Sequence, residues 1–406
     1  MVPKVIYSIF IFSIMVGNGI YIGPATLRQY CSILLFLYLC SNLWIVKRNS
    51  KLMVVYVVYV LLYGISSLLN DGLTLFVKQF IAQYLVSIVA YYTSLIIFNK
   101  CKNYNYIIWP IIIIGIINSI VNLMQYYGNS MAIALGAIFV DMDNESQVAK
   151  FTHLLNGTSG NTFGIMGDIV YNSYYSMIVP FFILMKFKNK IILSGLLALT
   201  IFSLFTIGER SPFGITVLLL VGYMYIQKRN SPVFWIIAVV GLIVASISVV
   251  DLLSSDIIQN SRFVTAEDGM RKEINSSIIS FILSNFIIGG YVKFVATVGM
   301  PPHNVIASGF VYAGFLGGFI ILYILIKQAS ICLAIYKYKN GILYSLPFVA
   351  YTLNGFFHNP AIVTGDAMVW ILWAMTYHSY KHAVTYNKFK YVRNKVSFNF
   401  SNCTYL

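Results

Sequence analysis

Charged side chains are scarce in this sequence. Asp, Glu, Lys and Arg together make up 10% of its 406 residues, whereas soluble domains carry about 25%. Hydrophobic residues reach 59%, and the mean hydropathy is +0.79. This balance excludes an ordinary soluble protein with a large core, and it predicts an integral membrane protein.

Cysteine is also rare, and the five cysteines show no C-x-x-C spacing. The sequence therefore favours neither a metal site nor a disulfide framework. It also lacks a P-loop, a G-x-S-x-G motif and an H-E-x-x-H motif, which excludes the common nucleotide, serine-nucleophile and zinc chemistries. We expect no metal and no cofactor, so any chemistry has to come from individual polar side chains.

The net charge of +15 would suggest a nucleic-acid partner in a soluble protein. Here Lys and Arg gather in short stretches between apolar runs, which is typical of the cytoplasmic loops of membrane proteins. We therefore expect no nucleic-acid partner.

Long apolar runs recur along the whole chain. A membrane-spanning helix needs about 20 such residues, and the sequence offers about 12 candidates, all of them helices because irregular backbone cannot face lipid. They lie at about 4–22, 26–46, 52–69, 74–98, 106–127, 171–186, 191–207, 212–227, 233–250, 305–327, 342–357 and 361–379. The predicted fold is an all-α polytopic membrane protein that forms one integral membrane domain over residues 1–406.

The basic residues predict an orientation. If the N-terminus lies in the cytoplasm and the spans alternate, most of the Lys and Arg residues, and none of the acidic ones, fall on the cytoplasmic side. This bias is the positive-inside rule, and it predicts that both termini are cytoplasmic.

Two long loops then lie on the outer face, at 128–170 and 251–304, and loops of this length usually carry function. In the second loop, Ile274, Ile278, Phe281 and Ile282 recur at helical spacing before a Gly-Gly pair. We expect a half-buried helix that lies over the bundle there.

Few basic residues fall on the outer face. Arg210 lies in the turn GERSP, Arg262 and Arg271 lie in the second long loop, and His303 begins the next span. Arginine is well suited to holding phosphate, because its planar fork gives two parallel charged hydrogen bonds. Each residue also has a purely structural explanation, such as a pair between Arg210 and Glu209 or between Arg271 and Glu267.

Three motifs together resemble the O-antigen polymerase (Wzy-type) and O-antigen ligase superfamily of bacterial membrane glycosyltransferases. They are the turn GERSP at 208–212, the stretch SNFIIGGYV at 284–292, and the stretch HNVIASGFVYAGFLGG at 303–318. The number of spans and the two long periplasmic loops also match that family.

The resemblance implies a GT-C-like fold and a metal-independent enzyme of the bacterial inner membrane. Its donor and acceptor would be oligosaccharides linked to undecaprenyl pyrophosphate, and its partner proteins would be a chain-length regulator and a flippase. His303, Arg210 and Arg271 would be catalytic, with the arginines holding the diphosphate and the histidine accepting a proton. The residues expected to bind substrate are Arg262, Asn304, Lys272, Arg28, Lys78 and His358.

Several functions remain open within and beyond this family. We favour a polymerase of O-antigen repeat units, because the chain is rich in Ile, Tyr and Asn and lacks a ligase-like continuation after His303-Asn304. An O-antigen ligase and a capsule or exopolysaccharide polymerase are the alternatives. The rival of another class is a flippase for lipid-linked oligosaccharides, which would need ionisable residues deep in the bundle.

Overall fold

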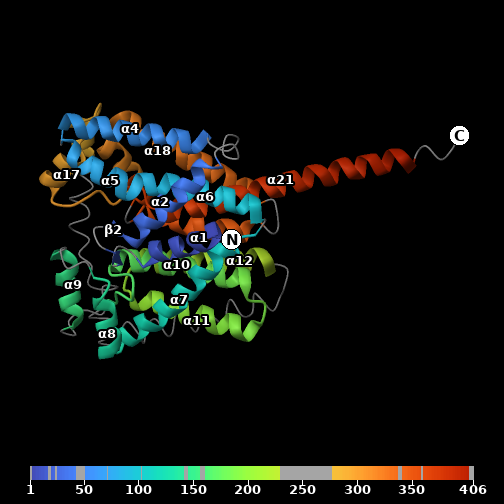
Figure 1. Ribbon diagram of the computed structural model, residues 1–406, viewed down its shortest axis with the longest axis horizontal. Helices are drawn as coiled ribbons and strands as arrows, with labels where there is room; N and C mark the ends of the chain where they lie inside the picture. Colours follow the sequence, from blue (N-terminus) through green and yellow to red (C-terminus); the bar gives the residue numbers. More distant parts are fainter. Residues whose placement is uncertain are drawn as a thin grey trace.

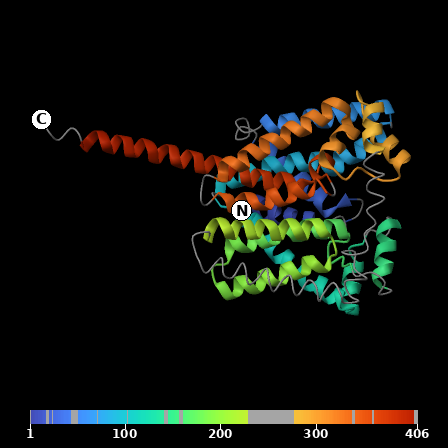
Figure 2. The ribbon, with the colours of Figure 1, turned by 180° about the vertical axis from the view of Figure 1, so that it is seen from behind.

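Nearly parallel helices form the body of the molecule in the computed structural model (Figure 1). The structure describes residues 2–16, 20–22, 25–42, 51–70, 72–101, 103–140, 145–155, 161–228, 277–336, 341–357 and 360–401. Helices α4 and α18 lie side by side along one edge, and α11 lies along the opposite edge. Helix α21 projects beyond the bundle, and the view from behind shows the same arrangement (Figure 2).

Helices dominate the described residues, with a single pair of two-residue strands beside them. The helices are α1 (Val2–Met15), α2 (Leu27–Cys40), α4 (Lys51–Asn70), α5 (Leu73–Gln79), the π-helix η2 (Phe80–Tyr84), α6 (Leu85–Cys101), α7 (Asn105–Tyr126), α8 (Ser130–Ala137), α9 (Glu145–Leu155), α10 (Ile169–Lys186), α11 (Lys190–Thr206), α12 (Arg210–Lys228), α17 (Tyr291–Val298), α18 (Val305–Tyr336), α19 (Ile342–Asn354), α20 (Ala361–Thr364) and α21 (Ala367–Ser401). Strands β1 (Tyr21–Ile22) and β2 (Ala25–Thr26) pair in an antiparallel hairpin.

Four helical stretches are long and apolar enough to cross a membrane: Lys51–Asn70, Leu73–Cys101, Asn105–Tyr126 and Val305–Tyr336. Shorter apolar helices accompany them at Pro3–Met15, Leu27–Cys40 and Lys190–Thr206. The apolar helices indicate a membrane-embedded protein, whereas about 12 spans and a GT-C-like fold remain predictions. The predicted span 233–250 lies outside the described residues.

Two of the predicted spans are wrong in detail. The first was expected over 4–22, but α1 ends at Met15 and Tyr21–Ile22 belong to β1. The last was expected as one helix over 361–379, but α20 ends at Thr364 and α21 begins at Ala367. Between them Gly365 adopts a φ of 76°, a left-handed conformation that glycine tolerates best and that ends a helix.

The two ends of the bundle can be told apart by the elements and side chains that lie there. One end, which we call the basic end, holds Lys4, Lys100, Lys186 and Lys381, where hydrogen bonds and ring contacts join the ends of α1, α2, α6, α7 and α10. At the opposite end, which we call the loop end, lie α8, α9 and α17 (Figure 1).

Helix α18 is broken within the third motif. Ala313 and Gly314 leave helical geometry, and Gly314 has a φ of 64°. The second motif pairs with this break, because the Gly290 amide donates to the Val311 carbonyl at 2.8 Å and the Phe315 amide donates to the Phe286 carbonyl at 2.7 Å. A Cβ on Gly314 would lie 2.3 Å from the Ile287 carbonyl oxygen. The two motifs therefore form one interlocked unit that requires glycine.

Part of the segment expected to form a half-buried helix in the second long loop lies within the described residues. Residues 277–284 are helical, and Ile278 and Phe281 are buried against Phe294 and Val311 in a small core of their own. Ile274 lies outside the described residues. The helix ends at Ser284, a turn follows over 285–288, and the Gly-Gly pair after it has positive φ at both positions.

The end of the first long loop is inserted into the bundle and held by buried amides. Gln125 accepts from the Phe163 and Gly164 amides at 3.1 and 2.9 Å, and Asn118 accepts from the Ile165 amide at 2.9 Å. Asn172 joins this network by donating to Asn122 and to the Thr162 carbonyl. Buried backbone groups need such partners, so these amides fix the loop at the loop end.

We predict that Gly314→Ala destabilises the protein by about 2–4 kcal/mol, since it combines a left-handed conformation with a backbone clash. The thermal unfolding midpoint of the purified protein in detergent measures this effect. Gly222→Ala in α12 is the control, because a Cβ there meets no atom within 4 Å. Equal midpoints for the two variants would contradict the close pairing of the second and third motifs at Gly314.

Candidate functional site

The starts of α12 and α18 meet the end of α19 at the loop end. The Ser211 hydroxyl, next to Arg210, lies 2.8 Å from the Asn354 side-chain oxygen. The Val305 amide donates to the Gly355 carbonyl at 2.9 Å. These two links bring the turn that carries Arg210 and the turn that carries His303 to adjacent residues, Asn354 and Gly355, at the end of α19.

Asn304 caps helix α18. Its side-chain oxygen accepts from the Ile306 and Ala307 amides at 2.9 and 3.2 Å, and its amide nitrogen donates to the Phe356 carbonyl at 3.4 Å. An asparagine before a helix usually has this role. The cap fixes the backbone of His303, whose side chain is half-buried, at the mouth of α18.

Asn354 is fully buried between the two turns. Its side-chain nitrogen has no hydrogen-bond partner among the described residues. A buried amide without a partner is costly, and it marks a position where a hydroxyl or phosphate oxygen could be bound. Glu209 is also buried, whereas Arg210 is exposed.

A second group of charges lies at the starts of α2 and α21. The Arg28 guanidinium donates to the Ala82 carbonyl of η2 at 3.4 Å, and its Nε has no partner among the described residues. The Asp366 carboxyl accepts from the Tyr351 hydroxyl at 2.5 Å and from the Met368 amide at 2.8 Å. Arg28 and Asp366 lie within electrostatic range of each other.

A layer of tyrosines connects the two groups. Tyr175 stacks on Tyr171 and Tyr351 at centroid distances of 6.0 and 6.3 Å, and Tyr174 packs edge-on against Tyr351 at 4.9 Å. Tyr174 lies within electrostatic range of both Glu209 and Asp366. We therefore treat the two groups as one site. We call it the polar cluster and define it as Arg28, Glu209, Arg210, His303, Asn354 and Asp366.

The π-helix η2 holds the turn that carries Asp366. The Tyr84 hydroxyl of η2 donates to the Val363 carbonyl at 3.0 Å, and the Ser87 hydroxyl of the adjoining helix α6 donates to the Gly365 carbonyl at 2.5 Å. The same π-helix receives the hydrogen bond from Arg28. Short π-helical turns are frequent at functional sites, and this one contacts both Arg28 and the turn that carries Asp366.

The predicted site residues are thus only partly brought together. Arg210, His303 and Asn304 share one region, and the tyrosine layer connects Arg28 to it. Lys78 is exposed on α5 and makes no hydrogen bond with the polar cluster among the described residues. Arg262, Arg271, Lys272 and His358 lie outside the described residues.

Sequence reasoning missed Asp366, Asn354 and the tyrosine layer. Asp366 had a usable signal, because it is an acidic residue inside a predicted span and such residues are usually functional. Tyr171, Tyr174 and Tyr175 follow helical spacing near the start of a span, which indicates one face but not its neighbours. Nothing near Asn354 distinguishes it from other polar residues at span ends.

The site's chemistry rests on two guanidinium groups, two carboxyls, an imidazole and an amide. Within the described part of the chain, no three His, Cys, Asp or Glu side chains gather as a metal site would require. The guanidinium groups are suited to oxyanions, and the imidazole can accept a proton near neutral pH.

We predict that Arg28 and Asp366 stabilise each other. Both side chains are half-buried and lie within electrostatic range of each other, so Arg28→Gln and Asp366→Asn should each lower the free energy of unfolding by removing this attraction. The double variant should lose less than the two single losses together, with a coupling of about 1 kcal/mol or more. Thermal unfolding of the four proteins in detergent measures it, and strictly additive losses would contradict the pair.

Comparisons of this chain with models of known protein families, with curated proteins and with solved structures find no match.

Proposed function

We propose that this chain is a polysaccharide polymerase of the bacterial inner membrane that joins oligosaccharide repeat units carried on undecaprenyl pyrophosphate. The observation that carries the proposal is the meeting of the Arg210 and His303 turns at Asn354, at the end of the bundle opposite the basic end. The three sequence motifs add their resemblance to the O-antigen polymerase and ligase superfamily.

The orientation of the bundle supports the location of the reaction. If the basic end faces the cytoplasm, as the positive-inside rule predicts, the polar cluster opens toward the periplasm and both termini are cytoplasmic. Donor and acceptor would arrive there from a flippase, already activated, and a chain-length regulator would set the product size.

The proposed reaction is a substitution at the anomeric carbon of the donor sugar. An acceptor hydroxyl oxygen forms the new bond to that carbon, and the bond from the carbon to the diphosphate oxygen breaks. The leaving diphosphate takes the bonding electron pair, and Arg210 stabilises its charge together with Arg271 and Arg262 of the second loop. His303 accepts the hydroxyl proton.

Arg28 and Asp366 would also take part in binding the substrate. Arg28 is held by η2, and its Nε has no partner in the part of the chain that the structure describes, so it can offer a charged hydrogen bond to a second phosphate or to a sugar hydroxyl. Asp366, fixed by Tyr351 and Met368, balances the Arg28 charge when no substrate is bound.

The supporting experiment deletes the gene and analyses the host surface polysaccharide. Single repeat units attached to the lipid core would support a polymerase. Full-length polymer that accumulates on undecaprenyl pyrophosphate would instead identify a ligase. Loss of all outward-facing repeat units would identify a flippase.

We predict that Arg210→Ala and His303→Ala complements of this deletion lose at least about 100-fold of polymer synthesis, because each removes a charge or proton acceptor used in the transition state. Gel analysis of the glycan ladder measures this loss, and immunoblots of the membrane fraction check protein levels. Lys188→Ala is the matched control, since Lys188 is an exposed cation near the basic end. Full-length polymer from either site variant would refute its catalytic role.

A further inference from the structure

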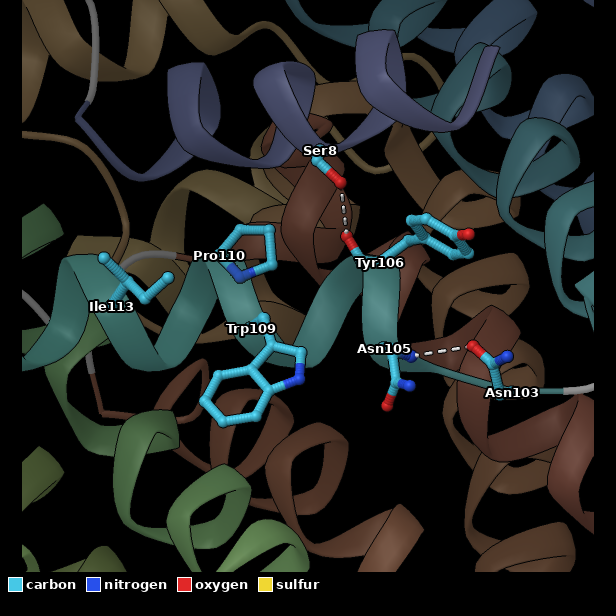
Figure 3. Close-up of a pocket in the computed structure, with 7 residues that line it drawn as sticks. All are labelled: Ser8, Asn103, Asn105, Tyr106, Trp109, Pro110 and Ile113. Atoms are coloured by element: carbon cyan, nitrogen blue, oxygen red, sulfur yellow. Dashed lines mark hydrogen bonds between the residues drawn. The ribbon is translucent and has the colours of Figure 1, made fainter. Parts of the chain in front are cut away.

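A groove of about 370 Å³ opens between α1 and α7 at the basic end (Figure 3). Its lining combines amides and a hydroxyl with large apolar groups, including Ser8, Asn103, Asn105, Trp109 and Ile113. The Ser8 hydroxyl donates to the Tyr106 carbonyl at 3.3 Å, so the two helices that form its walls are tied together. The polymerase mechanism uses none of these residues.

Two lysines flank the groove. The Lys186 ammonium donates to the Asn105 side-chain oxygen and lies 5.8 Å from the centroid of the Trp109 ring. The Lys4 ammonium lies 5.3 Å from the centroid of the Tyr106 ring. Both side chains are half-buried, with their charged heads held at aromatic rings. Each cation thus contacts side chains that line the groove.

The helices that supply these lysines carry no opposite charge. Helices α1, α7 and α10 contain no Asp or Glu. The positive charge at the groove is therefore not neutralised by its own walls, and it favours an anion.

An apolar stripe continues from the groove along α7. Trp109, Ile113, Ile117 and Ile120 are 42%, 54%, 46% and 45% exposed. Their spacing places them on one face of the helix. This stripe runs away from the polar groove toward the middle of α7, which is the direction that a lipid acyl chain would take from a headgroup at the basic end.

We infer that this groove binds an anionic glycerophospholipid. Lys4 and Lys186 would contact the headgroup phosphate, and the amides of Asn103 and Asn105 would hydrogen-bond the headgroup hydroxyls. Trp109 would lie at the level of the glycerol, where indole rings prefer to sit, and one acyl chain would cover Ile113, Ile117 and Ile120. Basic pockets between membrane helices on the cytoplasmic side are suited to such headgroups.

The test is native mass spectrometry of the full chain. The protein is purified in detergent, phosphatidylglycerol or phosphatidylcholine is added, and the lipid-bound fraction is measured after the detergent is removed in the spectrometer. We predict that the wild type retains phosphatidylglycerol preferentially. We also predict that Lys4→Gln/Lys186→Gln lowers the phosphatidylglycerol-bound fraction at least tenfold. Lys188→Gln/Lys190→Gln is the control, because it removes the same charge from exposed lysines near the same end and should leave binding unchanged.

A second measurement needs no lysine variant. In nanodiscs, phosphatidylglycerol brominated on its acyl chains should quench tryptophan fluorescence more than brominated phosphatidylcholine does, and Trp109→Phe should abolish the difference. Equal retention of both lipids, or an equal loss in the control variant, would overturn the inference. Displacement of phosphatidylglycerol by equimolar undecaprenyl phosphate would also overturn it, since the groove would then select a polyprenyl phosphate.

Discussion

The need to give every irregular backbone segment hydrogen-bond partners is the constraint on which the rest of this structure depends. In an apolar bundle, an unpaired amide or carbonyl costs several kcal/mol. The break in α18 is therefore paired by the Phe286–Gly290 segment, and the α20–α21 turn is paired by Tyr84 and Ser87. The inserted end of the first long loop is paired by Gln125 and Asn118. Each of these sets of hydrogen bonds joins segments that are separated in the sequence.

The location of these hydrogen bonds also bears on where the polar cluster lies. Irregular backbone near a functional site is tolerated only where protein surrounds it. The polar cluster draws His303 and Asp366 from the turns that begin α18 and α21, and Tyr84 and Ser87 stabilise the second of these turns. The tyrosines of α10 and α19 then fill the space between the charges and hold the Asp366 carboxyl.

Continuous apolar runs were enough to predict the long helices. The expected span 52–69 matches α4 (Lys51–Asn70), and the expected span 106–127 matches α7 (Asn105–Tyr126), within two residues. The breaks could not be predicted, because hydropathy carries no information about a carbonyl that a distant segment will satisfy. For the same reason Asp366 was overlooked inside an apolar run, whereas Arg210 and His303 stood out at span ends.

The most direct test of the central claim is polymer synthesis by the purified chain in liposomes, with undecaprenyl-pyrophosphate-linked repeat units as both donor and acceptor and a metal chelator present. The account predicts a ladder of glycans longer than one repeat unit and release of one undecaprenyl pyrophosphate for each bond formed. Movement of intact repeat units across the bilayer without any lengthening would contradict it.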